Sequence, residues 1–213
     1  APGDELIIVN DGSTDNTLNI LKSLQSEYPM LRVLHHDRRS GQSAALLTGI
    51  RAASNDIIAT LDGDGQNDPA DIPLLYNLYI AQQKITPNVM VAGQRKKRQD
   101  NLGRRLSSRF ANKLRSFLLR DNTRDTGCSL KMFSRTSYLN LPFFNHMHRF
   151  LPALMMRDGA TIAHVDVAHR PRVSGTSKYG NFSRAVVGVA DLMGVMWLQR
   201  RPNALPHVSE IKH

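Results

Sequence analysis

Short apolar runs alternate with longer amphipathic stretches along the first half of the chain. The runs are continuous in Ile, Val and Leu, which is typical of strands that are covered on both faces of a parallel sheet. The pattern therefore predicts a βαβ series and an α/β fold with a mostly parallel, doubly wound sheet. The expected strands are 6–10, 32–35, 57–61 and 89–93, and the expected helices are about 15–27, 42–54 and 70–83.

The second half of the chain loses this regular alternation, and we expect its elements to decorate the sheet. Its last apolar stretch, 185–198, is too short to cross a bilayer and contains Asp191, so it is either a core helix or a helix in a membrane interface. Trp197 beside Arg200-Arg201 favours the interface. The expected elements are helices near 103–119, 147–157 and 181–200 and strands near 130–134 and 161–168.

The net charge of +10 is divided unevenly between the two halves. Residues 1–90 carry 6 Lys and Arg against 11 Asp and Glu, whereas residues 91–213 carry 22 against 7. An acidic half suits a metal or cationic complex, and a basic half suits phosphates, nucleic acid or an anionic membrane. The basic runs 95–98 and 104–105 lack clustered aromatic residues, so we expect a solvated face or membrane attraction and no nucleic acid.

Composition and length indicate one compact α/β domain. The 213 residues include 41% hydrophobic and 22% charged residues, which is ordinary for a globular chain. We find neither an apolar run of 18 residues nor a signal segment, so we expect no transmembrane span. Cys128 is the single cysteine and indicates a reducing, cytoplasmic compartment. The chain lacks an initial Met and enters a strand pattern within five residues, so we expect an upstream segment to be missing.

Two carboxylates, Asp62 and Asp64, follow the third expected strand with one glycine between them. In extended geometry both point to the same side, where they could hold Mg²⁺ or Mn²⁺, with Gln66 as a third oxygen ligand. A plain turn is an equal alternative. An EF-hand loop is excluded because its sixth and twelfth positions are Asn67 and Pro73. An aspartyl-phosphate phosphatase is a further alternative, although those enzymes usually have Thr or Val at the position of Gln66.

Two further turns fall where ligands of α/β sheets bind, at the carboxyl ends of strands. In the segment 10–15, Ser13, Thr14 and Asp15 suit a helix N-cap, while Asp11 precedes the cap and is expected to be free to bind a nucleotide. The segment 39–43 precedes another helix, where free backbone N–H groups suit an anion. A plain turn is at least as good an interpretation of that second segment.

Several motifs occur in a specific order over nearly the whole chain. They are Val9 to Asp15, Gly41 to Gly49, Leu61 to Gln66, Gly93 to Arg95, Ser108-Arg109 with Asn112, Asp125 to Ser129, and His169 to Tyr179. In this order the chain resembles the family 2 glycosyltransferases of the polyprenyl-phosphate type, close to dolichyl-phosphate mannosyltransferases. The resemblance implies the GT-A (Rossmann-like) fold, a catalytic domain over 1–180 and a membrane-interface or packing helix and tail over 181–213.

The resemblance also assigns roles to residues. Asp62, Asp64 and Gln66 would bind the metal and the donor diphosphate, and Asp11 would contact the nucleotide. Arg95 and Arg109 would hold phosphate near the acceptor, so that Asp64, Arg95 and Arg109 form the catalytic set. Residues 1–94 would hold the nucleotide sugar and residues 95–180 the acceptor. In the signature that ends the motif series, Arg172, Ser177 and Lys178 would close over the donor phosphates.

The implied reaction transfers a sugar of the mannose or glucose type, with inversion, from a GDP- or UDP-sugar to a dolichyl or undecaprenyl phosphate at a membrane surface. An alternative within the family is a glycan or protein hydroxyl as acceptor, which would need a base such as Asp125. Outside the family, a phosphatase or a nucleotide-binding module without turnover remains. The chain departs from the family pattern in two ways: Asn10 replaces an aspartate, and the first strand and helix are absent.

Overall fold

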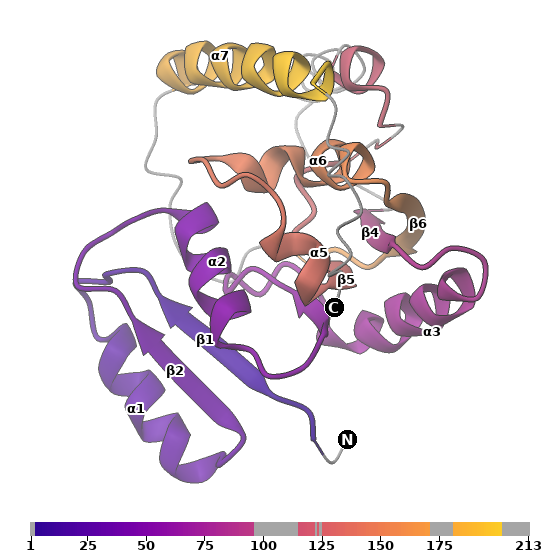
Figure 1. Cartoon of the computed structure of the whole chain (residues 1–213). Helices are drawn as coiled ribbons and strands as arrows, with labels where there is room; N and C mark the ends of the chain where they lie inside the picture. The colour runs from indigo at the N-terminus through magenta and orange to yellow at the C-terminus, as the bar shows by residue number, and fades with distance from the viewer. Residues whose placement is uncertain (1–2, 96–114, 122, 124, 171–180, 202–213) are drawn as a thin grey trace, which may run out of the picture.

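The structure is a computed structural model that describes residues 3–95, 115–121, 123, 125–170 and 181–201 (Figure 1). Strands and helices alternate through its first half, which confirms the α/β class that the apolar runs predict. The elements are β1 Leu6–Asn10, α1 Thr17–Glu27, β2 Leu31–His35, α2 Gln42–Ala52, β3 Ile57–Thr60, the 3-10 helix η1 Pro69–Asp71, α3 Ile72–Gln83 and β4 Val89–Arg95.

The second half contains two more strands, several short helices and the 19-residue helix α7. One short helix was not predicted: five-residue α5 begins where Ser134 accepts a hydrogen bond from the Ser137 backbone, and it is too short to show an apolar period. Residues 115–119 are also helical. The elements are β5 Lys131–Ser134, α5 Arg135–Leu139, the 3-10 helix η2 Met147–Phe150, α6 Leu151–Arg157, β6 Thr161–Val167 and α7 Asn181–Gln199.

The strands form two sheets. β1 and β2 make a parallel pair, with Leu6 opposite Leu31, and the other strands form a sheet in the order β3-β5-β4-β6. β5 is antiparallel to both of its neighbours, while β4 and β6 are parallel. Three of the four strands in the larger sheet thus run in one direction. The strand that comes late in the chain, β5, is inserted between β3 and β4, and local patterns carry no signal for such a long-range pairing.

The larger sheet is covered on both faces. Along β4, Met90 and Ala92 pack into a cluster with α2, α5, α6 and α7, whereas Val89 and Val91 pack into a second cluster with α3 and β6. Successive side chains of a strand point to opposite faces, so one apolar run supplies both cores. Figure 1 shows α3 on one side of this sheet and α6 with α7 on the other.

Helix α7 has one packed and one exposed side. Val195 is buried in the first cluster, while Val189, Met193 and Trp197 are 56%, 60% and 58% exposed. The Arg201 guanidinium lies 5.1 Å from the centre of the Trp197 ring. Within the described residues, no helix combines the length and the apolar character needed to cross a membrane. The helix therefore packs on the core and also presents an apolar strip beside a cationic residue.

Candidate active site

The carboxylate of Asp11, directly after β1, is fully engaged within the protein. Its Oδ1 atom accepts hydrogen bonds from the Ser40 backbone N–H at 2.8 Å and lies 2.8 Å from His36 Nδ1. Its Oδ2 atom accepts from the Gly41 backbone N–H at 2.8 Å. Burial alone would raise the pKa of Asp11, but the hydrogen bonds from His36, Ser40 and Gly41 lower it. The carboxylate is thus held ionised by its own protein.

This arrangement corrects two expectations. Asp11 is not free, because His36 and the turn before α2 occupy both of its oxygens. The backbone N–H groups of Ser40 and Gly41, which suited an external anion, bind this internal carboxylate instead. A contact between Asp11 and a nucleotide stays a prediction. The role that the structure gives Asp11 is to join the end of β1 to the start of α2.

Gly12 allows the same two loops to approach each other closely. Its φ is +64°, and a Cβ atom at this position would lie 2.5 Å from the carbonyl carbon of Arg38 and from the nitrogen of Arg39. Real Cβ atoms do not come so close to backbone, and the φ value is one that side chains disfavour. Glycine is therefore required here, at the contact between the loops after β1 and β2.

Gln42 connects this first loop to the acidic loop after β3. It is the first residue of α2, and its Nε2 atom donates a hydrogen bond of 2.7 Å to Asp62 Oδ1. The backbone N–H of Asp62 donates to Ser129 Oγ at 3.1 Å, and Ser129 in turn donates to Asn67 Oδ1 at 2.6 Å. Asp62 is thus positioned by α2 and by the loop before β5, and Ser129 is in turn held by Asn67.

Burial alternates along the acidic loop. Asp62, Asp64 and Gln66 are partly buried, whereas Gly63 and Gly65 are exposed. The Gln66 backbone N–H donates to Asp64 Oδ1 at 3.2 Å, so the segment is a turn rather than an extended strand. Two carboxylates and an amide oxygen are hard donors that suit Mg²⁺ or Mn²⁺.

The protein ligands of such a metal would be few. Searching the described residues finds no cluster of three or more His, Cys, Asp or Glu that could hold a metal. Mg²⁺ is commonly held by one or two carboxylates together with substrate phosphates and water. The residues at this loop fit a cation that binds together with a diphosphate, and they do not fit a closed metal cage.

Arg95, the last residue of β4, forms a two-pronged ion pair with Asp125. Its Nε and Nη2 atoms donate to the two carboxylate oxygens at 2.5 and 2.7 Å, and both side chains are less than 15% exposed. Such a paired arrangement fixes both planar groups. Asp125, the alternative base candidate, is therefore occupied as an acceptor. Arg95 is the last residue of β4, which runs two residues beyond the predicted strand, and its phosphate-binding role stays a prediction.

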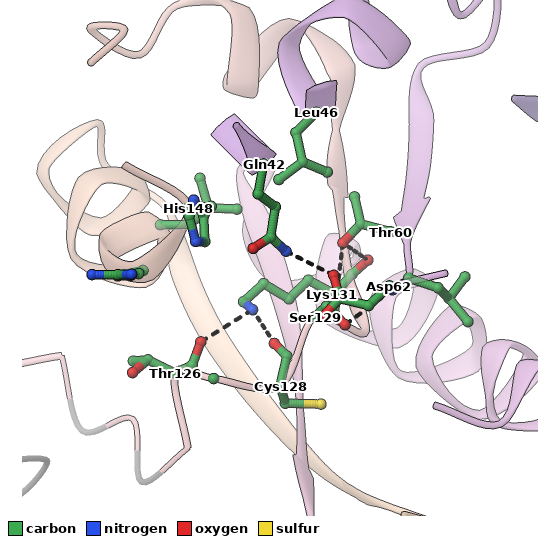
Figure 2. Close-up of a pocket in the computed structure, with 13 residues that line it drawn as sticks. Gln42, Leu46, Thr60, Asp62, Thr126, Cys128, Ser129, Lys131 and His148 are labelled. Atoms are coloured by element: carbon green, nitrogen blue, oxygen red, sulfur yellow. Dashed lines mark hydrogen bonds between the residues drawn. The ribbon is translucent and has the colours of Figure 1, made fainter. Parts of the chain in front are cut away.

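A cavity of about 230 Å³ lies beside Asp62 (Figure 2). Sequence reasoning missed its polar residues Lys131 and His148. Lys131 is 5% exposed, and its Nζ atom donates to the backbone carbonyls of Thr126 and Cys128. His148 Nδ1 lies 2.8 Å from Ser43 Oγ. One signal was present, since Lys131 is the only charged residue in the apolar strand segment 130–133.

Burial shifts the titration of both cavity residues. Desolvation lowers the pKa of His148 to about 4, with smaller contributions from the charges of Arg149, Lys131 and His146. Desolvation also lowers the pKa of Lys131, and the carboxylates of Asp62 and Asp125 oppose that shift. His148 is consequently neutral at physiological pH.

Four residues assigned to phosphate binding lie outside the described residues. They are Arg109, Arg172, Ser177 and Lys178. The described site residues lie at the carboxyl ends of β1, β3 and β4, which is where ligands of such sheets bind.

The sequence profile described as Glycosyl transferase family 2 matches residues 1–141. The chain belongs to this family. Membership of glycosyl transferase family 2 assigns the acidic loop to a glycosyltransferase and removes the phosphatase alternative. It confirms the resemblance that the ordered motifs indicated.

Two curated family 2 relatives match almost the whole chain. Dodecaprenyl-phosphate galacturonate synthase of Rhizobium johnstonii is 38% identical over 200 residues, which cover 92% of this chain and 58% of the relative. Undecaprenyl-phosphate 4-deoxy-4-formamido-L-arabinose transferase of Pectobacterium carotovorum is 32% identical over 191 residues, covering 89% of this chain and 56% of the relative. The chain thus spans little more than half the length of these relatives.

Solved structures confirm the GT-A-like fold of this family 2 chain. Glucosyl-3-phosphoglycerate synthase from Mycobacterium tuberculosis, in complex with Mn²⁺, UDP-glucose and glycerol 3-phosphate, superposes with a TM-score of 0.66. The match covers 92% of this chain and 69% of that one at 18% identity. A complex of the same enzyme with Mg²⁺ and UDP gives a TM-score of 0.62 at 19% identity.

Proposed function

We propose that this chain carries the catalytic part of an inverting glycosyltransferase that moves a sugar from a nucleotide diphosphate to a polyprenyl phosphate. One observation carries the proposal: an acidic loop, Asp62 to Gln66, is held at the carboxyl end of β3 in a chain whose two curated relatives are named for polyprenyl phosphates. The acidic loop lies at the strand end where ligands of such sheets bind, and the names of the relatives indicate the class of acceptor.

For the donor side, Asp62, Asp64 and Gln66 are proposed to hold Mg²⁺ or Mn²⁺ together with the diphosphate. The cation would supply positive charge against the negative charge that develops on the leaving diphosphate. Complexes of the solved structural relatives contain Mn²⁺ or Mg²⁺, which supports this choice. Gln42 and Ser129 keep Asp62 in position for that task. Arg172, Ser177 and Lys178 are proposed to bind the donor phosphates.

For the acceptor side, Arg95 and Arg109 are proposed to orient the attacking phosphate. A phosphate is already ionised near neutral pH, so its attack on the anomeric carbon needs no general base. The ion pair between Asp125 and Arg95 supports this acceptor over a hydroxyl, because it occupies the carboxylate that a hydroxyl would need as a base. Attack in a single displacement inverts the anomeric carbon, so an α-linked donor gives a β-linked product.

We further propose that the domain works at the cytoplasmic face of a membrane, where a polyprenyl phosphate presents its head group. The apolar strip on α7, formed by Val189, Met193 and Trp197, lies near the cationic Arg201. Such an apolar strip with adjacent positive charge suits the interface of an anionic bilayer. No nucleic acid partner is proposed.

The test is transfer of labelled sugar to a polyprenyl phosphate in detergent by the full-length protein. GDP-mannose, UDP-glucose and a UDP-hexuronate would each be supplied with Mn²⁺, or with a chelator in place of the metal. We expect label in the lipid phase from at least one donor, and its loss with chelator. Label on a glycan hydroxyl but never on the lipid would overturn the acceptor assignment, and transfer that persists in chelator would overturn the metal assignment.

A further inference from the structure

The cavity beside Asp62 contains a buried lysine. Lys131 is 95% buried, since its exposed fraction is 5%, and its ammonium donates to two backbone carbonyls, those of Thr126 and Cys128. An ammonium group has three donors, and carbonyl groups carry no net charge. Among the described residues, Lys131 forms no ion pair. A desolvated positive charge of this kind is costly unless an anion compensates it.

The other groups that face the cavity do not supply that anion at contact distance. Arg149 adds a second positive charge, and His148 is neutral and bonded to Ser43. The charges of Cys128, Asp62 and Asp125 act on Lys131, but no ion pair joins Lys131 to either carboxylate within the described residues. A metal bound at Asp62 would neutralise part of the negative charge near Lys131. The need for an anion in the cavity would then increase.

The size and lining of the cavity select a small amphipathic group. Its volume of about 230 Å³ is below the roughly 300 Å³ of the smallest pockets for drug-sized ligands. Its lining is mixed: Leu46, Leu61 and Leu151 are apolar, and Gln42 and Lys131 are polar. Figure 2 shows Gln42 reaching toward Asp62 and the Lys131 side chain extending between Asp62 and the loop that holds Thr126 and Cys128. A single sugar ring, with its C–H faces and hydroxyl edge, matches this lining.

We propose that this cavity receives the sugar of the donor, and that Lys131 selects a sugar that carries a carboxylate, which is a hexuronic acid. The proposal rests on the donor reaction proposed above, and it specifies the donor class. Lys131 then acts as a specificity determinant: its ammonium pairs with the sugar carboxylate, while Gln42 and Ser129 lie within the same cavity to contact hydroxyl groups. A neutral hexose would leave the buried charge without a partner.

Two donors that differ only at C6 test this selection. UDP-galacturonate and UDP-galactose are compared with the full-length protein, Mn²⁺ and a polyprenyl phosphate, and kcat/KM is measured for each. We expect the wild type to prefer the uronate by about 10- to 100-fold, which is the effect of one hydrogen-bonded charge pair. The Lys131→Met variant should lose that preference by losing rate with the uronate alone. Lys131→Arg keeps the charge and should retain most of it.

The ratio of kcat/KM for the two donors distinguishes a role of Lys131 in sugar recognition from a purely structural role. Lys131 also bonds to the loop that contains Thr126 and Cys128, so a purely structural role would lower both rates equally and leave the ratio unchanged. Lys22→Met, at an exposed position of α1, is the matched control. An unchanged ratio in Lys131→Met, or a wild type that prefers galactose, would overturn the proposal.

If Lys131→Met does not fold, binding of the two nucleotide sugars to the wild type tests the proposed preference for the uronate. Calorimetric titration of each nucleotide sugar in the presence of Mn²⁺ should give a lower Kd for UDP-galacturonate than for UDP-galactose by a similar factor. Equal Kd values would contradict the selection even if transfer occurs. Conversely, tight uronate binding without transfer to any polyprenyl phosphate would count against the proposed reaction and leave the selection intact.

Discussion

Two acidic loops at the carboxyl ends of strands have similar sequences and different surroundings. The carboxylate of Asp11 accepts hydrogen bonds from two backbone N–H groups and contacts His36, so it satisfies a turn within the protein. Asp62 and Asp64 accept hydrogen bonds from the Gln42 side chain and from the Gln66 backbone N–H, and Asp62 also lines a cavity. The difference teaches that a carboxylate at a strand end is not by itself a ligand site, and that its hydrogen-bond partners decide its role.

The largest expected effect is on activity at the second loop. Asp64→Asn should lower sugar transfer by about 100- to 1,000-fold, because it removes a negative charge where the metal and diphosphate are proposed to bind. The substitution keeps an oxygen acceptor for the Gln66 N–H, so the melting temperature should change little. Transfer rate and thermal denaturation are measured together. Asp37→Asn, an exposed aspartate, is the control. Unchanged transfer in Asp64→Asn would remove the second loop from the reaction.

At the first loop the largest expected effect is on stability. Gly12→Ala should lower the free energy of unfolding by about 2 to 4 kcal/mol, because the φ of +64° is unfavourable for alanine and its Cβ would meet backbone at 2.5 Å. Urea denaturation measures this change. Gly63→Ala, where a Cβ would meet nothing within 4 Å, should differ from the wild type by less than about 0.5 kcal/mol. Equal losses of unfolding free energy in Gly12→Ala and Gly63→Ala would mean that the close approach of the loops after β1 and β2 does not contribute to stability.

Asp11→Asn should lower the free energy of unfolding at pH 7 by about 1 to 2 kcal/mol, because it removes the charge that receives three hydrogen bonds. The folded-state pKa of Asp11 is lowered, so the stabilisation is present above the unfolded pKa and decreases as the pH falls through the folded one. Urea denaturation of the wild type and of Asp11→Asn at pH 7 measures this loss of unfolding free energy. If Asp11→Asn instead abolished transfer without loss of stability, Asp11 would be a donor ligand and the contrast between the loops would fail.

The smallest expected effect is at His148, beside the second loop. Its pKa is lowered to about 4 in the folded state, so the unfolded chain binds more protons between about pH 6.5 and 4. The free energy of unfolding should therefore fall as the pH decreases from 7 to 5, by on the order of 1 kcal/mol after allowance for solvent screening. His148→Gln should lose this part of the pH dependence, and His35→Gln, at an exposed position, should keep it. Parallel curves for the wild type and His148→Gln would show that His148 is protonated normally.

Most strands and helices followed from local pattern, because continuous apolar runs and their spacing depend on neighbouring residues. The acidic turn around Asp62 was also predicted from sequence, whereas β4 runs two residues beyond the predicted strand 89–93 and ends at Arg95. The pairing of β5 between β3 and β4 was not predicted, since β5 lies about 70 residues from its partners in β3 and about 40 from those in β4. The contact of Asp11 with His36 was not predicted for the same reason, because the two residues are 25 positions apart. Local sequence indicates the chemical type of a residue, while its partners depend on how distant segments meet.

The close approach at Gly12 has a consequence for protein engineering. An attempt to change donor preference by grafting the loop 10–13 from a relative would bring in side chains shaped for another loop after β2. Because Gly12 faces the backbone of Arg38 and Arg39, and Asp11 binds the turn at Ser40 and Gly41, the segments 10–13 and 36–41 form a single exchangeable unit. A chimera that transplants both segments together should fold, whereas one that transplants only the first should not.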